Sequence, residues 1–161
     1  MSFALAAVLF IPVSLSAQSG SSARSGSSDS VEVSSGVRRF LTAFENLEWE
    51  PFHSAFSDSA TIFHPAPIMP ALFSGRAAID STFRLVFDDI RAHASGGPPY
   101  HSLPPVGLRI KPLAPGIVLV TFELHNAERL GRRTVVFRRE GNAWKIFHLH
   151  ASNIAVQSGR P

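Results

Sequence analysis

The sequence predicts an α+β domain in which about three N-terminal helices pack on one face of a curved antiparallel sheet. Apolar residues recur at helical spacing through the first two-thirds of the chain and alternate with polar residues through the last third. Turn residues divide that last third into short segments. Helices first and an antiparallel meander last are typical of α+β domains, whose concave sheet face commonly binds small ligands.

Three helices are expected in the N-terminal part of the domain. The first begins near Ser35, with Ser34 or Ser35 placed to cap it, and its apolar face comprises Val37, Phe40, Leu41, Phe44 and Leu47. The second helix covers residues 51–56 and begins with proline, which is well tolerated at that position. A short strand over residues 60–64 precedes the third helix, expected over residues 76–89.

Four strands are expected in the last third, over residues 106–113, 117–126, 132–139 and 144–154. Leu130-Gly131 and Gly141-Asn142 are expected to form the turns of two hairpins.

The first 17 residues predict a secretory signal peptide. Their apolar run, residues 3–15, is shorter than the roughly 20 residues that cross a bilayer, and it ends in small residues. No basic residue precedes the run, so retention as an anchor is the alternative to cleavage near Ala17. Residues 18–34, rich in serine and glycine, predict a flexible linker. We therefore expect a secreted or periplasmic protein with no membrane contact after cleavage.

Composition excludes several classes of protein. The 161 residues contain no cysteine, which rules out disulfides, thiol nucleophiles and cysteine-ligated metals. The net charge is only +3, and arginine pairs such as Arg132-Arg133 do not extend into a basic stripe. We expect these pairs to be solvated strand edges, and we expect no nucleic-acid partner.

Two stretches resemble known proteins. Residues 36–65, ending Phe-Ser-Asp-Ser-Ala-Thr-Ile-Phe-His-Pro, and residues 73–79, Phe-Ser-Gly-Arg-Ala-Ala-Ile, resemble ketosteroid isomerases and SnoaL-like proteins. Residues 134–152, with Trp-Lys-Ile-Phe-His-Leu-His-Ala-Ser, resemble the end of the calcium/calmodulin-dependent kinase II association domain. The resemblance implies a cone-shaped domain of the nuclear transport factor 2-like superfamily over residues 35–157, and a homodimer.

The resemblance carries over to catalytic positions in part. His64 falls where ketosteroid isomerases keep the aspartate that shuttles the substrate proton, whereas Phe40 and Val135 replace their oxyanion donors. Scytalone dehydratase, of the same superfamily, uses pocket histidines, so the resemblance implies proton transfer by histidine without a cofactor. The kinase association domain lines its pocket with arginines, and Glu123 and Val135 fall at those positions, which argues against an anionic ligand of that type.

Glu123 and His125 are candidates to orient His64. They lie two residues apart on a strand, so both side chains leave the same face. If that face is concave, a carboxylate and an imidazole share the pocket. The alternative is that the neighbouring apolar residues are buried and Glu123 is in solvent. The pattern alone leaves the choice open.

His148 and His150 also share one strand face, and we include them among the ligand-binding candidates with Phe40, Trp49 and Val135. With a third ligand they could chelate a metal, but no spacing matches an established motif, so we expect no metal site. Which face of this strand points inward stays open, because alignment by the Gly141 turn and alignment by length give opposite answers.

The functional hypothesis is an exported pocket protein that binds a small, largely apolar organic molecule. If it is an enzyme, the chemistry is cofactor-free isomerisation, dehydration or cyclisation, with His64 as the acid/base. The alternative is a non-catalytic ligand-binding or dimerisation module.

Overall fold

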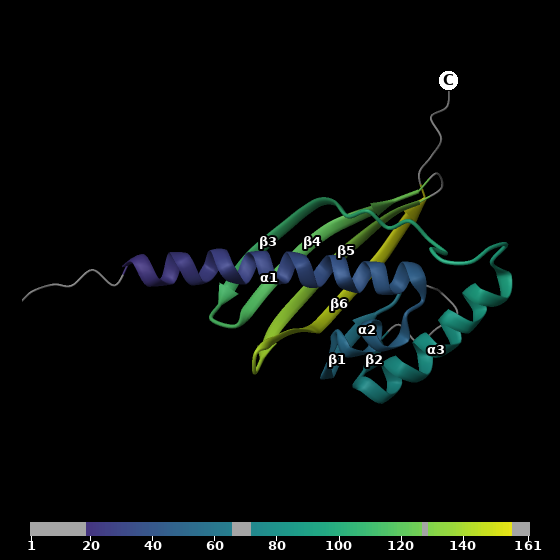
Figure 1. The fold of residues 1–161 in the computed structure, drawn as a ribbon, viewed down its shortest axis with the longest axis horizontal. Coiled ribbons are helices and arrows are strands. Elements are labelled where there is room, and N and C mark those ends of the chain that lie inside the picture. The colour runs from purple at the N-terminus through teal and green to yellow at the C-terminus, as the bar shows by residue number, and fades with distance from the viewer. Residues whose placement is uncertain (1–18, 66–71, 127–128, 156–161) are drawn as a thin grey trace, which may run out of the picture.

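The computed structural model describes residues 19–65, 72–126 and 129–155 (Figure 1). In this part of the chain the elements follow in the order α1 (Ser19–Asn46), α2 (Trp49–Ser54), β1 (Phe56–Phe63), β2 (Leu72–Ser74), α3 (Arg76–His93), β3 (Val106–Ala114), β4 (Ile117–His125), β5 (Arg129–Glu140) and β6 (Ala143–Ala155). The expected signal peptide, residues 1–17, lies outside the described residues. None of the described helices combines the length and apolarity needed to cross a membrane.

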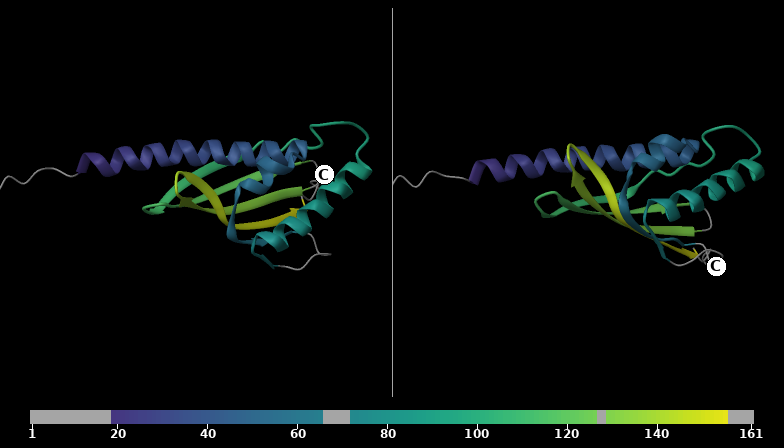
Figure 2. Two further views of the ribbon diagram at one scale, coloured as in Figure 1. Left: turned by 60° about the horizontal axis from the view of Figure 1, so that its bottom comes forward. Right: turned by 90° about the horizontal axis from the view of Figure 1, so that it is seen from below.

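The strands form one open, curved sheet in the order β2-β1-β6-β5-β4-β3. All neighbouring strands are antiparallel except β1 and β6, which are parallel. The helices lie on one face of the sheet: α1 crosses it diagonally, and α3 covers the end near β1 and β2 (Figures 1 and 2). The α+β expectation is confirmed, with one parallel pairing and the short strand β2 that the sequence did not predict.

The core fills the space between this sheet face and the helices, and Phe52 of α2 lies at its centre. Phe52 is 1% exposed. Its ring centroid lies 5.3 Å from that of Phe40, 4.8 Å from that of Phe83 and 5.0 Å from that of Phe87. Because these rings come from all three helices, the cluster fixes the helices to one another and to the sheet.

The expected linker is wrong, because α1 begins at Ser19 and runs through that segment without a break. Val33 is fully buried, and Arg139 of β5 forms ion pairs with Asp29 at 2.6 Å and Glu32 at 3.0 Å. The indole of Trp144 also donates to Glu32. Serine and glycine have low helix propensity, but the burial of Val33 and the ion pairs of Asp29 and Glu32 stabilise the helix.

The expected turn at Leu130-Gly131 is also wrong. Both residues lie within β5, where Leu130 pairs with His125 and Gly131 pairs with Leu124. The expected turn at Gly141-Asn142 is confirmed, since Gly141 has a φ of 60° between β5 and β6.

A bulge in β6 settles which residues of that strand face inward. Phe137 pairs with Ile146 and Val136 pairs with His148, so Phe147 is an extra residue with no partner in the β5 register. The extra residue reverses the alternation, which places both Ile146 and Leu149 in the core. Alignment by the Gly141 turn and alignment by length predict opposite inward faces for this strand, and each prediction therefore holds on one side of the bulge.

Candidate functional site

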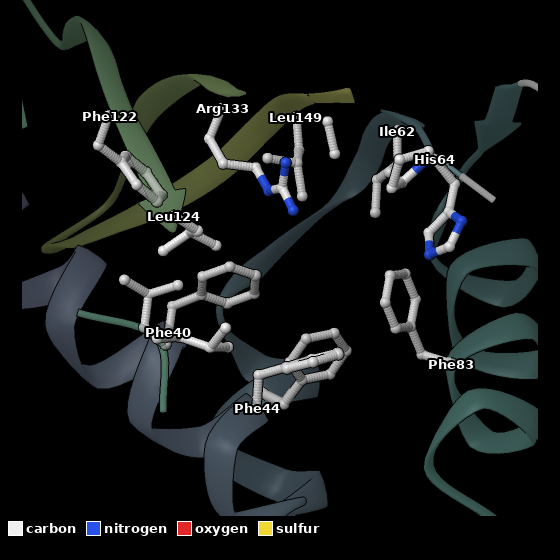
Figure 3. A pocket seen from close by; sticks show the side chains of 14 residues that line it. Phe40, Phe44, Ile62, His64, Phe83, Phe122, Leu124, Arg133 and Leu149 are labelled. Atoms are coloured by element: carbon white, nitrogen blue, oxygen red, sulfur yellow. The ribbon is translucent and has the colours of Figure 1, made fainter. Parts of the chain in front are cut away.

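A cavity of about 120 Å³ lies between the inner sheet face and the helices (Figure 3). Fourteen residues line it, and all of them except His64 and Arg133 are apolar. The lining comprises Phe40, Leu41, Phe44, Phe52, Ile62, His64, Pro65, Phe83, Leu103, Phe122, Leu124, Arg133, Leu149 and Ala151. The site is thus an apolar cavity with two nitrogen-bearing side chains.

Helical and strand periodicity together produce this lining. Phe40 and Phe44 lie one helical turn apart on α1, so both rings face the sheet. Phe122 and Leu124 of β4 alternate with outward-facing residues and therefore point back toward the helices. The helices thus supply a mainly aromatic wall, and the strands supply Phe122, Leu124 and Leu149.

His64 follows directly on β1 and faces the cavity on the same side as Ile62. Its ring is half-buried and lies edge-on to those of Phe73 and Phe83, with centroid distances of 6.3 and 5.8 Å. Burial lowers the pKa of His64 below its usual 6.5, and the positive charge of Arg133 lowers it further. The neutral imidazole is therefore favoured near neutral pH, which suits a proton acceptor.

Arg133 reaches into the cavity from β5. Its Nη1 donates to the carbonyl oxygens of Arg132 at 2.9 Å and Ser152 at 3.2 Å, and to Asn153 Oδ1 at 3.3 Å. Within residues 19–65, 72–126 and 129–155, no carboxylate lies within ion-pair distance of this guanidinium. Burial lowers the pKa of Arg133.

Gly131 makes room for this guanidinium. A Cβ atom at Gly131 would lie 3.0 Å from Arg133 Nη1 and 3.1 Å from Asn153 Oδ1, which is too close for an ordinary contact. The glycine that the sequence suggested as a turn residue instead allows an arginine to lie along the strand at the cavity.

The segment between α3 and β3 helps to close the cavity. The backbone carbonyl of Glu45 accepts from Tyr100 N at 2.8 Å, and the Glu45 carboxylate accepts from the backbone N–H of Leu103. Leu103 lines the cavity, and His101 stacks on Phe44 with a centroid distance of 6.0 Å. One residue near the end of α1 thus holds this cover in place.

Sequence comparison matches residues 33–157 to the SnoaL-like domain family. The chain belongs to this family. No curated protein is similar enough to match the chain.

Solved structures of low sequence identity share the fold of this SnoaL-like domain. A nuclear transport factor 2-like protein of unknown function from Pseudomonas putida aligns with a TM-score of 0.66 at 16% identity, over 84% of this chain and 98% of that chain. A ketosteroid isomerase-like protein from Erwinia carotovora atroseptica gives 0.62 at 12% identity, over 78% and 96%. The hub homology domain of calcium/calmodulin-dependent kinase II from Chlamydamonas reinhardtii gives 0.60 at 16% identity, over 78% and 98%.

The SnoaL-like domain brings two of the residues singled out from the sequence, His64 and Phe40, into the cavity. Trp49 lies behind the lining, where it packs against Phe52 and carries the Arg84 guanidinium 3.9 Å above its ring. Val135 is buried in the core and does not line the cavity.

Glu123 and His125 do not meet His64. Val120 and Phe122 are buried, so alternation directs Glu123 and His125 to the outer face of the sheet. There His125 Nε2 lies 2.8 Å from Glu123 Oε2, and about half of each side chain is exposed. An orienting role toward His64 is therefore excluded in this structure.

His148 and His150 also lie on the outer face of the SnoaL-like domain, with Arg132 and Thr134 around a shallow polar depression. The Nδ1 atom of His148 lies 2.7 Å from Thr61 Oγ1. Burial and, second, the charge of His150 lower the pKa of His148. In the described residues no three acidic or histidine side chains are grouped to hold a metal.

Arg133 is the cavity residue that sequence reasoning missed. The expectation of a solvated arginine pair is correct for Arg132, which is exposed, and wrong for Arg133. Alternation offered the signal, because Val135 and Phe137 are the buried apolar residues of β5 and Arg133 shares their face.

Proposed function

We propose that this SnoaL-like domain binds a small, largely apolar organic molecule in the cavity between α1, α3 and the sheet. The observation that carries the proposal is a cavity lined by apolar side chains except at His64 and Arg133. Its volume of about 120 Å³ is near the ~150 Å³ in which an engineered apolar cavity binds benzene, so a ligand the size of one ring fits.

The cavity also supports cofactor-free proton transfer. A neutral His64 would take a proton from a carbon next to a carbonyl group and return it to another atom of the same molecule, as in isomerisation, dehydration or cyclisation. The guanidinium of Arg133 would stabilise the negative charge that develops on the carbonyl oxygen. It would thereby replace the oxyanion donors that Phe40 and Val135 do not provide.

Binding is tested with a screen of neutral and acidic single-ring compounds by saturation-transfer NMR on the purified protein. We expect hits that the cavity-filling substitution Leu124→Trp abolishes and that Leu113→Trp, at an exposed residue, leaves intact. Hits that bind both variants equally would show that the cavity is not the site.

Catalysis is tested by incubating the hits in D₂O and following exchange of their carbon-bound protons by NMR. We expect exchange with the wild-type protein and with His125→Gln, and none above buffer with His64→Gln. Hits that bind without exchange would identify a non-catalytic binding module.

The second candidate function is an association module that uses the outer sheet face. This face carries Phe63, 37% exposed, beside His150 with a centroid distance of 5.5 Å. A protein of similar fold, the hub homology domain of calcium/calmodulin-dependent kinase II, is consistent with a role in assembly. We propose a homodimer through this face, and a monomeric mass by light scattering at micromolar concentration would contradict it.

Export is proposed from residues 1–17 alone. Mass spectrometry of the protein isolated from its native host tests this proposal: a chain that begins near Gln18 supports cleavage and export, and an intact Met1 contradicts cleavage.

A further inference from the structure

We infer that the ligand of this cavity carries a carboxylate, which Arg133 binds while the apolar body of the ligand lies against the aromatic rings of the helices. This inference rests on the proposed small-molecule site and names the chemical class of its ligand. It reverses the sequence expectation that an anionic ligand is disfavoured.

The cavity holds one guanidinium group among apolar side chains. Arg133 is half-buried beside Phe122 and Leu149, and no carboxylate of the described residues pairs with it. Burying a charge is costly unless it is both paired and hydrogen-bonded, and the bonds from Nη1 supply acceptors but no negative charge. An apolar residue would occupy this position at a lower free-energy cost than a guanidinium. We therefore expect an anion that the described residues do not supply to pair with Arg133.

Arg133 uses one of its three nitrogen atoms for hydrogen bonds to the described residues. Every hydrogen bond that the guanidinium makes with the described residues runs from Nη1. Nε and Nη2 therefore keep their donors available, and one edge of a guanidinium matches the two oxygens of a carboxylate. The carbonyl oxygens that Nη1 binds hold the group in place before a ligand arrives.

The site has a polar side at Arg133 and an apolar side at the helices. Gly131 has no side chain that would displace the guanidinium, and Asn153, its partner on β6, accepts a hydrogen bond from Arg133 Nη1 at 3.3 Å. The rings of Phe40, Phe44 and Phe83 form the opposite wall of the cavity (Figure 3). A ligand with one charged end and one ring-sized apolar end therefore matches both walls, as a small aryl or cycloalkyl carboxylate does.

The test compares benzoate with benzamide, which has the same shape without the charge, by titration calorimetry on the full chain. We expect benzoate to bind about tenfold or more tightly than benzamide, because hydrogen bonds to charged groups contribute roughly 1.5–3 kcal/mol. Arg133→Gln should remove this preference while benzamide binding stays, which also shows that the variant is folded. The matched control is Arg132→Gln, at the exposed neighbour, which should keep the preference.

Three results would overturn the inference. Equal affinities of the wild-type protein for the two compounds would show that the cavity binds neutral ligands and does not recognise the carboxylate. A preference for benzoate that survives in Arg133→Gln but disappears in Arg132→Gln would place anion binding on the outer face. Absence of binding of both compounds, with neutral hits from the screen still bound in the cavity, would reject this ligand class and leave the proposed function standing.

Discussion

Arg132 and Arg133 are neighbours in β5, yet their side chains lie on opposite faces of the sheet. Arg132 is exposed beside Thr134 in the outer depression, whereas Arg133 lines the cavity. A surface charge and a charged side chain of the cavity are thus adjacent in the sequence. The two positions form a natural matched pair for experiments on this protein.

Gly131→Ala should weaken carboxylate binding without loss of stability. The added Cβ would lie 3.0 Å from Arg133 Nη1 and would push the guanidinium from its place. Alanine is better tolerated in a strand than glycine, so the melting temperature should not fall by much. We expect benzoate affinity to drop about three- to tenfold, because charged hydrogen bonds depend on geometry.

The control for this prediction is Gly96→Ala, since a Cβ at Gly96 would meet no atom within 4 Å. Unchanged benzoate affinity in Gly131→Ala, measured by the same calorimetric titration, would mean that the guanidinium does not hold the ligand.

His64 should make the protein less stable at acid pH. Its pKa is lowered in the folded state, so the unfolded chain binds protons more readily just below pH 6.5. The resulting stabilisation is present above about pH 6.5 and is lost as the pH falls through the lowered pKa of His64. Urea unfolding of the wild type at pH 7.5 and 5.0 should therefore show a drop in the free energy of unfolding.

His64→Gln should have a smaller drop over the same pH range, because the substituted side chain does not titrate. His148 contributes a drop of the same sign through its own lowered pKa, so His148→Gln is the matched comparison. A pH dependence in His64→Gln identical to that of the wild type would contradict the burial of His64 next to Arg133.

Phe52→Ala should destabilise the protein by about 3–5 kcal/mol, as expected for loss of a large core side chain. Phe52 of α2 contacts rings of α1 and α3, so its removal leaves a void that neighbouring rings cannot fill without moving the helices. Chemical denaturation monitored by circular dichroism measures the loss. Phe63→Ala, at a side chain 37% exposed, should cost much less.

Removal of the N-terminal part of α1 distinguishes a structural helix from a linker. A chain that begins at residue 28 keeps Val33 and the ion pairs of Asp29 and Glu32 with Arg139, and it should melt close to the full-length temperature. A chain that begins at residue 36 loses them, together with the bond from Trp144, and should melt several degrees lower. Equal melting temperatures of the two chains would restore the linker interpretation.

Most of the fold was predictable because the periodicity of its apolar residues is strong. The helical spacing of Val37, Phe40 and Leu41 and the alternation of Val118, Val120 and Phe122 correspond directly to buried faces. The errors at α1 and at Gly131 share a cause, since serine and glycine were interpreted by local propensity while tertiary contacts determine their conformation.

The site was less predictable than the fold. His64 was found through a family resemblance and does line the cavity. Alternation shows which residues share a strand face with Glu123 or with His150, but it does not show which face points inward. The bulge at Phe147 also reverses the inward face within β6. The arginine pair predicts a solvated edge, whereas alternation with the buried Val135 and Phe137 puts Arg133 on the inner face and Arg132 on the outer face.

The central claim, that the cavity holds a small acid beside Arg133 and His64, is tested most directly by methyl NMR. The isoleucine and leucine methyl groups are labelled, and benzoate is titrated into the full chain. We expect saturable shifts at Ile62, Leu124 and Leu149, which line the cavity, and none at the exposed Leu113. Shifts confined to exposed methyl groups, or no shift at millimolar benzoate, would contradict it.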